Sequence, residues 1–225
     1  MQSDLEQFSE TTSTEAFALQ NHKLLKVHLD QVTIQAKLGS MVAYQGEVSF
    51  EHAGAGGLGR LVKKVATGEG QSLMKMSGQG EVFLADSAQD IHLFYLQDDR
   101  ITVNGRNVLA FDDGIDWDIE RIKSVAGMVG GGLFNTKLEG TGWVAVLTDG
   151  PPVRLDVSQA PTFADAQAAV AWSSGVTTTM KTDIKLKSLV GLGSGEAFQM
   201  AFAGEGWVLV QPSEGRIMVT AKSGG

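Results

Sequence analysis

The sequence has no cysteine and no long apolar run, and each absence excludes a class of protein. Without cysteine the chain can form no disulfide, no thiolate nucleophile and no cysteine-ligated zinc or iron–sulfur site. No apolar run approaches the roughly 18 to 20 residues of a membrane-spanning helix, so we do not expect an integral membrane protein. The first residues are acidic where a signal peptide is basic. A cytoplasmic location is therefore the default expectation.

Positive charge is also scarce, because 18 lysines and arginines stand against 26 acidic residues and the formal net charge is −8. A general nucleic-acid-binding domain is basic, so nucleic acid is not expected as a partner. The 225 residues, 43% of them hydrophobic, are enough to bury a substantial core. These properties indicate a globular protein.

A pattern that ends in an aromatic residue occurs three times, and each copy leads into a polar turn. The copies are MVAY at 41–44, VLAF at 108–111 and AVAW at 169–172. A short alternating stretch follows each turn, as in 48–50 and 115–117. A strand, a turn with glycine and a second strand predict a hairpin in each copy.

A second pattern, two glycines before an apolar strand, recurs at the same spacing. It reads GQGEVFL at 78–84, GTGWVAV at 140–146 and GEGWVLV at 204–210. Both patterns recur at a spacing of roughly 60 to 65 residues, which indicates a duplicated supersecondary unit. We predict a flexible leader at 1–20 and one β domain at 21–225, with repeats at about 24–88, 89–150 and 151–215.

The paired glycines are predicted to be structural. Glycines two apart at the start of a strand share one face, where another backbone can approach closely. The set is Gly78, Gly80, Gly140, Gly142, Gly204 and Gly206. The strand that follows is apolar on both faces, since Val144 and Val146 point one way and Ala145 and Leu147 the other. Such strands need cover on both sides, which three units meeting at an axis would supply.

Helical patterning is confined to 60–65 and 163–168, which are too short for the crossover connections of a parallel sheet. We therefore predict an all-β fold of three repeated antiparallel units that form a pseudo-threefold β-prism or sandwich.

These patterns together resemble the altered-inheritance-of-mitochondria protein 24 family, which in bacteria is a domain of unknown function. The matching patterns are LDQV at 29–32, LGSMVA at 38–43, LAF at 109–111, GSGEAF at 193–198 and FAGEGWVLVQP at 202–212. The resemblance covers about residues 20–215 and implies a three-unit β-prism similar to the trp RNA-binding attenuation protein, a shortened double-stranded β-helix that often forms oligomers. The first repeat departs from it, because Glu81 stands where the other repeats have tryptophan.

Motifs of catalysis are weak throughout. Residues 54–59 spell G-x-G-x-x-G, but the helix and βαβ context of a dinucleotide site is missing. The serine of 193–195 lacks the spacing of a nucleophile elbow, and the four histidines form no local metal motif. The acidic run at 112–120 is typical of a solvated hairpin. We predict no enzyme, no catalytic residue, no cofactor and no metal. A spatial cluster of His28, His92 and carboxylates would favour an enzyme.

Basic residues flank the glycine-rich stretches at 54–59, 127–132 and 191–195. They are Arg60, Lys63, Lys64, Arg121, Lys123, Lys185 and Lys187. Gathered at one end with nearby apolar residues, they could contact a partner protein or an anionic membrane surface. The same loops could instead pack in an oligomer interface.

The leading functional hypothesis is a non-enzymatic homo-oligomeric scaffold or adaptor with an unknown protein partner. The alternatives are small-ligand or RNA binding, by analogy with the attenuation protein, and peripheral membrane association through the basic loops.

Overall fold

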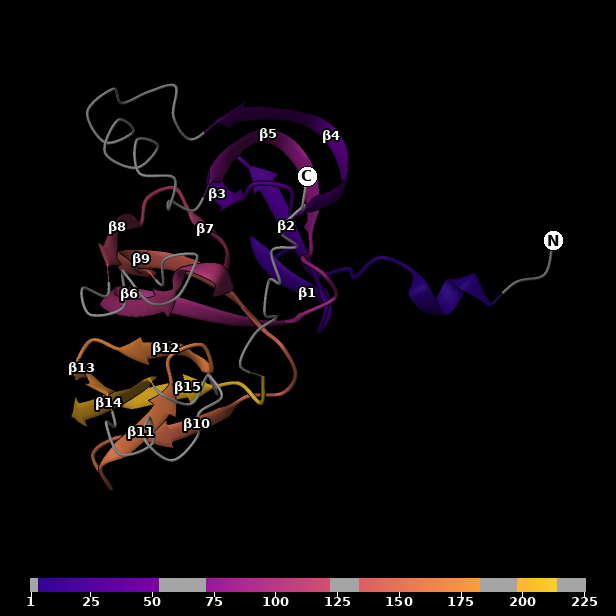
Figure 1. The fold of residues 1–225 in the computed structure, drawn as a ribbon. Helices are drawn as coiled ribbons and strands as arrows, with labels where there is room; N and C mark the ends of the chain where they lie inside the picture. The colour runs from indigo at the N-terminus through magenta and orange to yellow at the C-terminus, as the bar shows by residue number, and fades with distance from the viewer. Residues whose placement is uncertain (1–3, 53–71, 122–133, 183–197, 214–225) are drawn as a thin grey trace, which may run out of the picture.

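The computed structural model describes residues 4–52, 72–121, 134–182 and 198–213, and most of their regular structure is β-strand (Figure 1). The first part of the chain forms β1 (Phe17–Asn21), β2 (Leu24–Asp30), β3 (Ile34–Lys37), β4 (Met41–His52) and β5 (Leu73–Leu84). The middle forms β6 (Asp90–Asn104), β7 (Val108–Asp112), β8 (Asp116–Arg121) and β9 (Phe134–Thr148). The last part forms β10 (Val153–Asp156), β11 (Thr162–Asp165), β12 (Ala169–Ser173), β13 (Val176–Thr182), β14 (Phe198–Gly204) and β15 (Trp207–Val210).

Within the described ranges the only helices are two short 3-10 turns, η1 (Leu5–Phe8) and η2 (Gly105–Asn107), and the strand pairs are antiparallel. The predicted all-β antiparallel class is therefore confirmed. Among the same residues no helix is long and apolar enough to cross a membrane. The helical interpretation of 163–168 is wrong, because β11 pairs along its length with β14 and places Ala164 opposite Met200. Such tertiary pairing overrides the helix preference of an alanine-rich segment.

The repeat in the sequence is a repeat of strand pairings. We define unit 1 as β1–β5, unit 2 as β6–β9 and unit 3 as β10–β15. Each unit contains one pair of glycines. The stretch after the second glycine of the pair lies between β2 and β4 in unit 1, between β6 and β7 in unit 2, and between β10 and β12 in unit 3. The stretch before the first glycine lies between β3 and β4 in unit 1, between β6 and β8 in unit 2, and between β11 and β13 in unit 3. Each unit thus uses its glycine-bearing chain as the centre of two ladders.

Two junctions of the same kind join the units. β3 of unit 1 pairs with β7 of unit 2, and the second half of β6 in unit 2 pairs with β12 of unit 3. These junctions connect most strands into a 12-stranded sheet, while β11, β14 and β13 form a separate three-stranded sheet. In Figure 1 the three units lie in series, with unit 1 at the top and unit 3 at the bottom.

The core consists of three apolar clusters, and neighbouring units share two of them. The first combines the interior of unit 1 with Leu109, Ala145 and Leu147 of unit 2. The second combines the interior of unit 2 with Val170, Ala171 and Leu209 of unit 3, and the third lies within unit 3. The predicted two-sided burial of β9 is confirmed, since Val144 and Val146 belong to the second cluster and Ala145 and Leu147 to the first. Consecutive cores, one on each face of β9, supply its cover.

The paired glycines lie inside long strands or between two strands. Gly78 and Gly80 are in the middle of β5, Gly140 and Gly142 in the middle of β9, and Gly204 and Gly206 at the β14–β15 break. Their φ angles are positive, for example +149° at Gly142. A Cβ at Gly80 would collide with the carbonyl oxygen of Gln45, and one at Gly142 would lie 2.6 Å from Asp112 Oδ2. Glycine therefore lets the crossing chain approach where one ladder gives way to the next.

Candidate functional site

A buried polar contact lies on one face of unit 1, the face turned away from the first apolar cluster. The register places Lys26 of β2 beside Phe83 of β5, and Phe83 beside Ala43 of β4. In the next row His28, Glu81 and Gln45 lie side by side. We call these six residues the outer face of unit 1.

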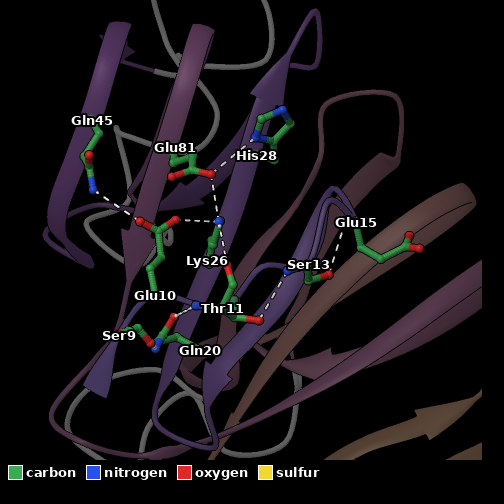
Figure 2. A network of polar contacts seen from close by, with 10 residues as sticks. All are labelled: Ser9, Glu10, Thr11, Ser13, Glu15, Gln20, Lys26, His28, Gln45 and Glu81. Atoms are coloured by element: carbon green, nitrogen blue, oxygen red, sulfur yellow. Dashed lines mark hydrogen bonds and ion pairs between the residues drawn. The ribbon is translucent and has the colours of Figure 1, made fainter. Parts of the chain in front are cut away.

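Lys26 is the centre of this face (Figure 2). Its side chain is only 4% exposed, and its ammonium group lies between two carboxylates. Nζ donates to Glu10 Oε1, lies 2.7 Å from Glu81 Oε1, and donates to the carbonyl oxygen of Thr11 at 3.1 Å. The three donors of the ammonium group therefore each have an oxygen partner.

The segment before β1 supplies two of these three oxygens. The Thr11 amide donates to Gln20 Oε1 at 2.8 Å, and Gln20 Nε2 donates to the Ser9 carbonyl at 3.0 Å. Gln45 Nε2 reaches Glu10 Oε2 at 3.4 Å. Figure 2 shows Ser9, Glu10 and Thr11 beside the strands that carry Lys26 and Glu81. Part of the predicted leader is thus held across the outer face of unit 1, and β1 begins inside the predicted leader range, with Phe17 buried.

The charges of this cluster explain its pKa shifts. Burial acts to lower the pKa of Lys26, but the hydrogen bonds and charges of Glu10 and Glu81 outweigh it and raise the pKa. The hydrogen bond from Lys26 lowers the pKa of Glu81, and the contact with Glu10 adds to this effect. His28 Nδ1 lies 3.6 Å from the same Glu81 oxygen.

This arrangement suits a structural clamp better than a reactive centre. A catalytic lysine that acts as a base or nucleophile needs a lowered pKa and an accessible amine, whereas Lys26 has a raised pKa and an enclosed, fully hydrogen-bonded ammonium group. The carboxylates hold the lysine, and the lysine in turn holds residues 9–11 against the strands.

The equivalent faces of the other units have a different chemistry. In unit 2 the register places Leu93 beside Ala145 and Tyr95 beside Trp143, so that Leu93 and Trp143 stand where unit 1 has Lys26 and Glu81. Trp143 stacks on Phe17 of unit 1 at 6.3 Å between ring centroids. In unit 3 Trp207 takes the same place and stacks on Phe94 of unit 2 at 5.6 Å. These two faces are the docking faces between units.

The backbone amides of Trp143 and Trp207 are each held by the last residue of a neighbouring strand, β7 or β12. Asp112 Oδ2 accepts from the Trp143 amide at 2.6 Å, and Ser173 Oγ accepts from the Trp207 amide at 3.0 Å. Burial raises the pKa of Asp112, and the hydrogen bond from Trp143 partly opposes this. In unit 1 the equivalent Gln45 contacts Glu10 instead.

The basic residues predicted for partner or membrane contact fall almost entirely outside the described ranges. Those outside are Arg60, Lys63, Lys64, Lys123, Lys185 and Lys187. Arg121 ends β8, with only its backbone described. The glycine-rich stretches at 54–59, 127–132 and 191–195 also lie outside. The contact predicted for these loops stays a prediction.

The histidines with described side chains do not converge. His92 Nε2 lies 2.9 Å from Thr148 Oγ1, and burial lowers the pKa of His92, while His28 contacts Glu81 and His22 lies 3.7 Å from Asp90. No group of three or more histidine, aspartate or glutamate side chains suited to a metal occurs in the part of the chain that the structure describes.

Sequence reasoning missed Lys26, Glu10 and Glu81 as a set. One signal was visible, since Glu81 breaks the aromatic pattern of the other repeats. The sequence alone does not pair Glu81 with Lys26. The strand register does, because it places Glu81 in the row next to Lys26.

Comparison with known proteins places this fold. A family model described as "Mitochondrial biogenesis AIM24" matches residues 17–213. The chain belongs to the AIM24 family. The resemblance inferred from the repeats is therefore confirmed, and the match includes Lys26 and Glu81 but not Glu10. No curated protein matches the chain.

A crystal structure of a protein from Streptococcus pyogenes is similar to this AIM24-family chain over 88% of its length and 92% of the bacterial chain. The TM-score is 0.69 and the sequence identity is 21%. At this identity the likeness shows a shared fold and carries no function across.

Proposed function

We propose that this AIM24-family chain is a non-enzymatic scaffold or adaptor that acts as a homo-oligomer. The observation that carries the proposal is that the first and last units of the series each have an edge strand with exposed apolar side chains. Among the described residues, β11 is an edge strand that pairs only with β14, and β4 pairs only with β5. Both carry exposed apolar side chains, including Val42, Tyr44 and Phe163. Monomeric proteins usually protect such edges with charge, proline or a covering segment.

The chemistry of the buried lysine supports the non-enzymatic part. The one enclosed amine in the described residues is Lys26, whose pKa is raised and whose hydrogen bonds are all used. Its hydrogen bonds to Glu10 and Thr11 hold residues 9–11 against the strands of unit 1. A body of repeated units is suited to assembly and to the display of binding surfaces.

As part of the same proposal, the three repeated units form an open β-prism, whose edges β11 and β4 pair with other copies and not with each other within one chain. It is supported by the matching pairings of the three units and by a junction that is used twice. A prism closed within one chain would require a third junction between β11 and β4, and this pair does not occur among the described strands.

Light scattering coupled to size-exclusion chromatography tests the proposed self-association. The expected result is a mass that is a multiple of the chain mass and that rises from low to high micromolar concentration until the assembly is complete. A constant monomer mass over this range would disprove the homo-oligomer. Sedimentation velocity on the same samples gives an independent measure of the shape and the mass.

A further inference from the structure

The two internal junctions follow one register. At the first, Gln35 of β3 lies opposite Phe111 of β7, and Ala36 lies opposite Ala110. At the second, Thr102 of β6 lies opposite Trp172 of β12, and Val103 lies opposite Ala171. In both junctions the aromatic residue that ends the first sequence pattern faces a residue of the preceding unit.

The glycine-bearing strands identify the strands that would make a third junction. Gln35 pairs with Lys75, Thr102 with Lys137 and Phe163 with Ala201, and each of these partners stands at the same position before its first glycine. Phe163 of β11 is therefore the unit 3 counterpart of Gln35 and Thr102. By the first sequence pattern, Tyr44 of β4 is the unit 1 counterpart of Phe111 and Trp172.

Burial separates the internal copies from the terminal ones. Gln35 and Thr102 are each 6% exposed, whereas Phe163 is 45% exposed. Phe111 and Trp172 are buried, whereas Tyr44 is 49% exposed. Ala110 and Ala171 are fully buried, but Ala43 is exposed. The positions that are buried in both internal junctions are therefore exposed where they recur in β11 of unit 3 and in β4 of unit 1.

We propose that β11 of one copy pairs in antiparallel fashion with residues 41–44 of β4 in a second copy, in the register of the internal junctions. The inference rests on the proposed homo-oligomer and specifies its interface. Phe163 then lies opposite Tyr44 of the second copy, Ala164 opposite Ala43, and Thr162 opposite Gln45. β4 and β11 belong to units at opposite ends of the series (Figure 1), so the contact joins two chains.

A second copy fits these edges by size and by chemistry. The register repeats the Ala36–Ala110 pair as Ala164–Ala43, which keeps small residues where the strands approach. It also adds Phe163 to Tyr44, which already packs edge-on against Phe50 at 5.2 Å. Aromatic pairs across neighbouring strands stabilise a sheet. Because the two edges differ, the contact is heterologous and continues from copy to copy, into a ring if it closes and a filament if it does not.

Two lysine substitutions test the pairing, because an edge lysine opposes strand addition. Phe163→Lys disables the β11 edge and Tyr44→Lys disables the β4 edge. Each variant alone is expected to associate at least tenfold or so more weakly than the wild-type chain. An equimolar mixture is expected to form a dimer and nothing larger, because one intact β11 can pair with one intact β4. Leu19→Lys, on exposed β1, is the matched control and keeps the wild-type mass.

Cysteine cross-linking tests the register directly, because the natural chain has no cysteine. Phe163→Cys carrying a mass tag is mixed with Tyr44→Cys and oxidised, since side chains directly opposite in a ladder lie within disulfide reach. The expected product is a cross-link between the two different variants. Phe163→Cys with Leu19→Cys is the control pair and is expected to give no cross-link above background.

Each outcome decides between the two proposals. If the wild-type chain is monomeric at every concentration, both the homo-oligomer and its interface are wrong. If the chain is oligomeric but both lysine variants keep the wild-type mass, the oligomer stands and the pairing of β11 with β4 is wrong. A Phe163→Cys homodimer as the main product would indicate a twofold contact and would also overturn the head-to-tail pairing. Circular dichroism confirms that each variant is folded.

Discussion

The outer faces of units 1 and 2 occupy equivalent places in equivalent ladders, yet one is polar and the other apolar. Unit 2 presents Leu93 and Trp143, and Trp143 stacks on Phe17 of its neighbour. Unit 1 presents Lys26 and Glu81, and the chain's own residues 9–11 lie across them. The difference shows two ways of covering the same face, because the neighbouring unit 1 covers it in unit 2 and the chain's own residues 9–11 cover it in unit 1. In unit 1 the Lys26–Glu81 ion pair and the segment before β1 satisfy the polar groups of this face.

The largest loss of stability is expected when Trp143 of unit 2 is replaced by glutamate, the residue at the equivalent position of unit 1. Trp143→Glu removes the ring stacked on Phe17 and sets a carboxylate against the first apolar cluster. We expect a loss of about 4 kcal/mol in the free energy of unfolding, measured by urea denaturation. Leu19→Glu on the exposed surface of β1 is the control and should change stability by less than about 0.5 kcal/mol. A loss at Trp143 no larger than the control's would show that the docking face contributes little.

A smaller loss is expected when the clamp of unit 1 loses its cation. Lys26→Met leaves Glu10 and Glu81 close together without a counter-charge, and we expect a loss of about 2 kcal/mol at neutral pH because the carboxylates keep some access to water. The double variant Lys26→Met/Glu81→Leu puts apolar side chains at the two positions where unit 2 has Leu93 and Trp143, and should recover at least half of the loss. Equal stability of the single and double variants would argue against charge as the cause.

The pH dependence of stability sharpens the role of Glu81. Its folded-state pKa is lowered, so its contribution is fully present above the ordinary value of 4.5 and disappears as the pH falls through the lowered pKa. Glu81→Gln should therefore cost about 1 kcal/mol at pH 7 and progressively less below the ordinary carboxyl pKa. Unfolding curves of both proteins across the acidic range measure this difference. A difference that does not change with acidification would contradict an ionic role.

The smallest effect is expected at Asp112, the last residue of β7, whose carboxylate accepts from the Trp143 amide. The pKa of Asp112 is raised above 3.8 by burial, so its charged form slightly opposes folding at neutral pH and this penalty vanishes in acid. Asp112→Asn keeps an acceptor for the Trp143 amide without the charge, and we expect it to be equal to or about 0.5 kcal/mol more stable than the natural chain at pH 7. Asp112→Ala, which leaves that amide without its acceptor, should be less stable in thermal unfolding.

The sequence predicted the features that local patterns determine. The alternation of Val144, Ala145, Val146 and Leu147 has period two, so the two-sided burial of β9 could be read directly. The repeat and the family could be inferred because both signatures recur at one spacing. The order of cores along the chain could not, because it depends on the pairing of β3 with β7 and of β6 with β12, and these partners are far apart in the sequence.

The candidate site could be predicted only in part, because it too depends on contacts between residues far apart in the sequence. Glu81 stood out as the missing aromatic residue, but nothing local predicts that Lys26 is buried beside it or that Glu10 folds back to the same ammonium group. A lysine in a strand is ordinarily on the solvated side. Here the covering segment removes the water, and that segment lies in the part of the sequence with the least periodicity.

The alternating side chains of β9 have a consequence for how the protein unfolds. One strand contributes to the first core on one face and to the second core on the other, so neither core can open without exposing the strand that the other needs. Amide protons of units 1 and 2 should therefore exchange with solvent at one common, slow rate. A single cooperative transition then replaces the independent melting expected of repeats that touch only at their surfaces.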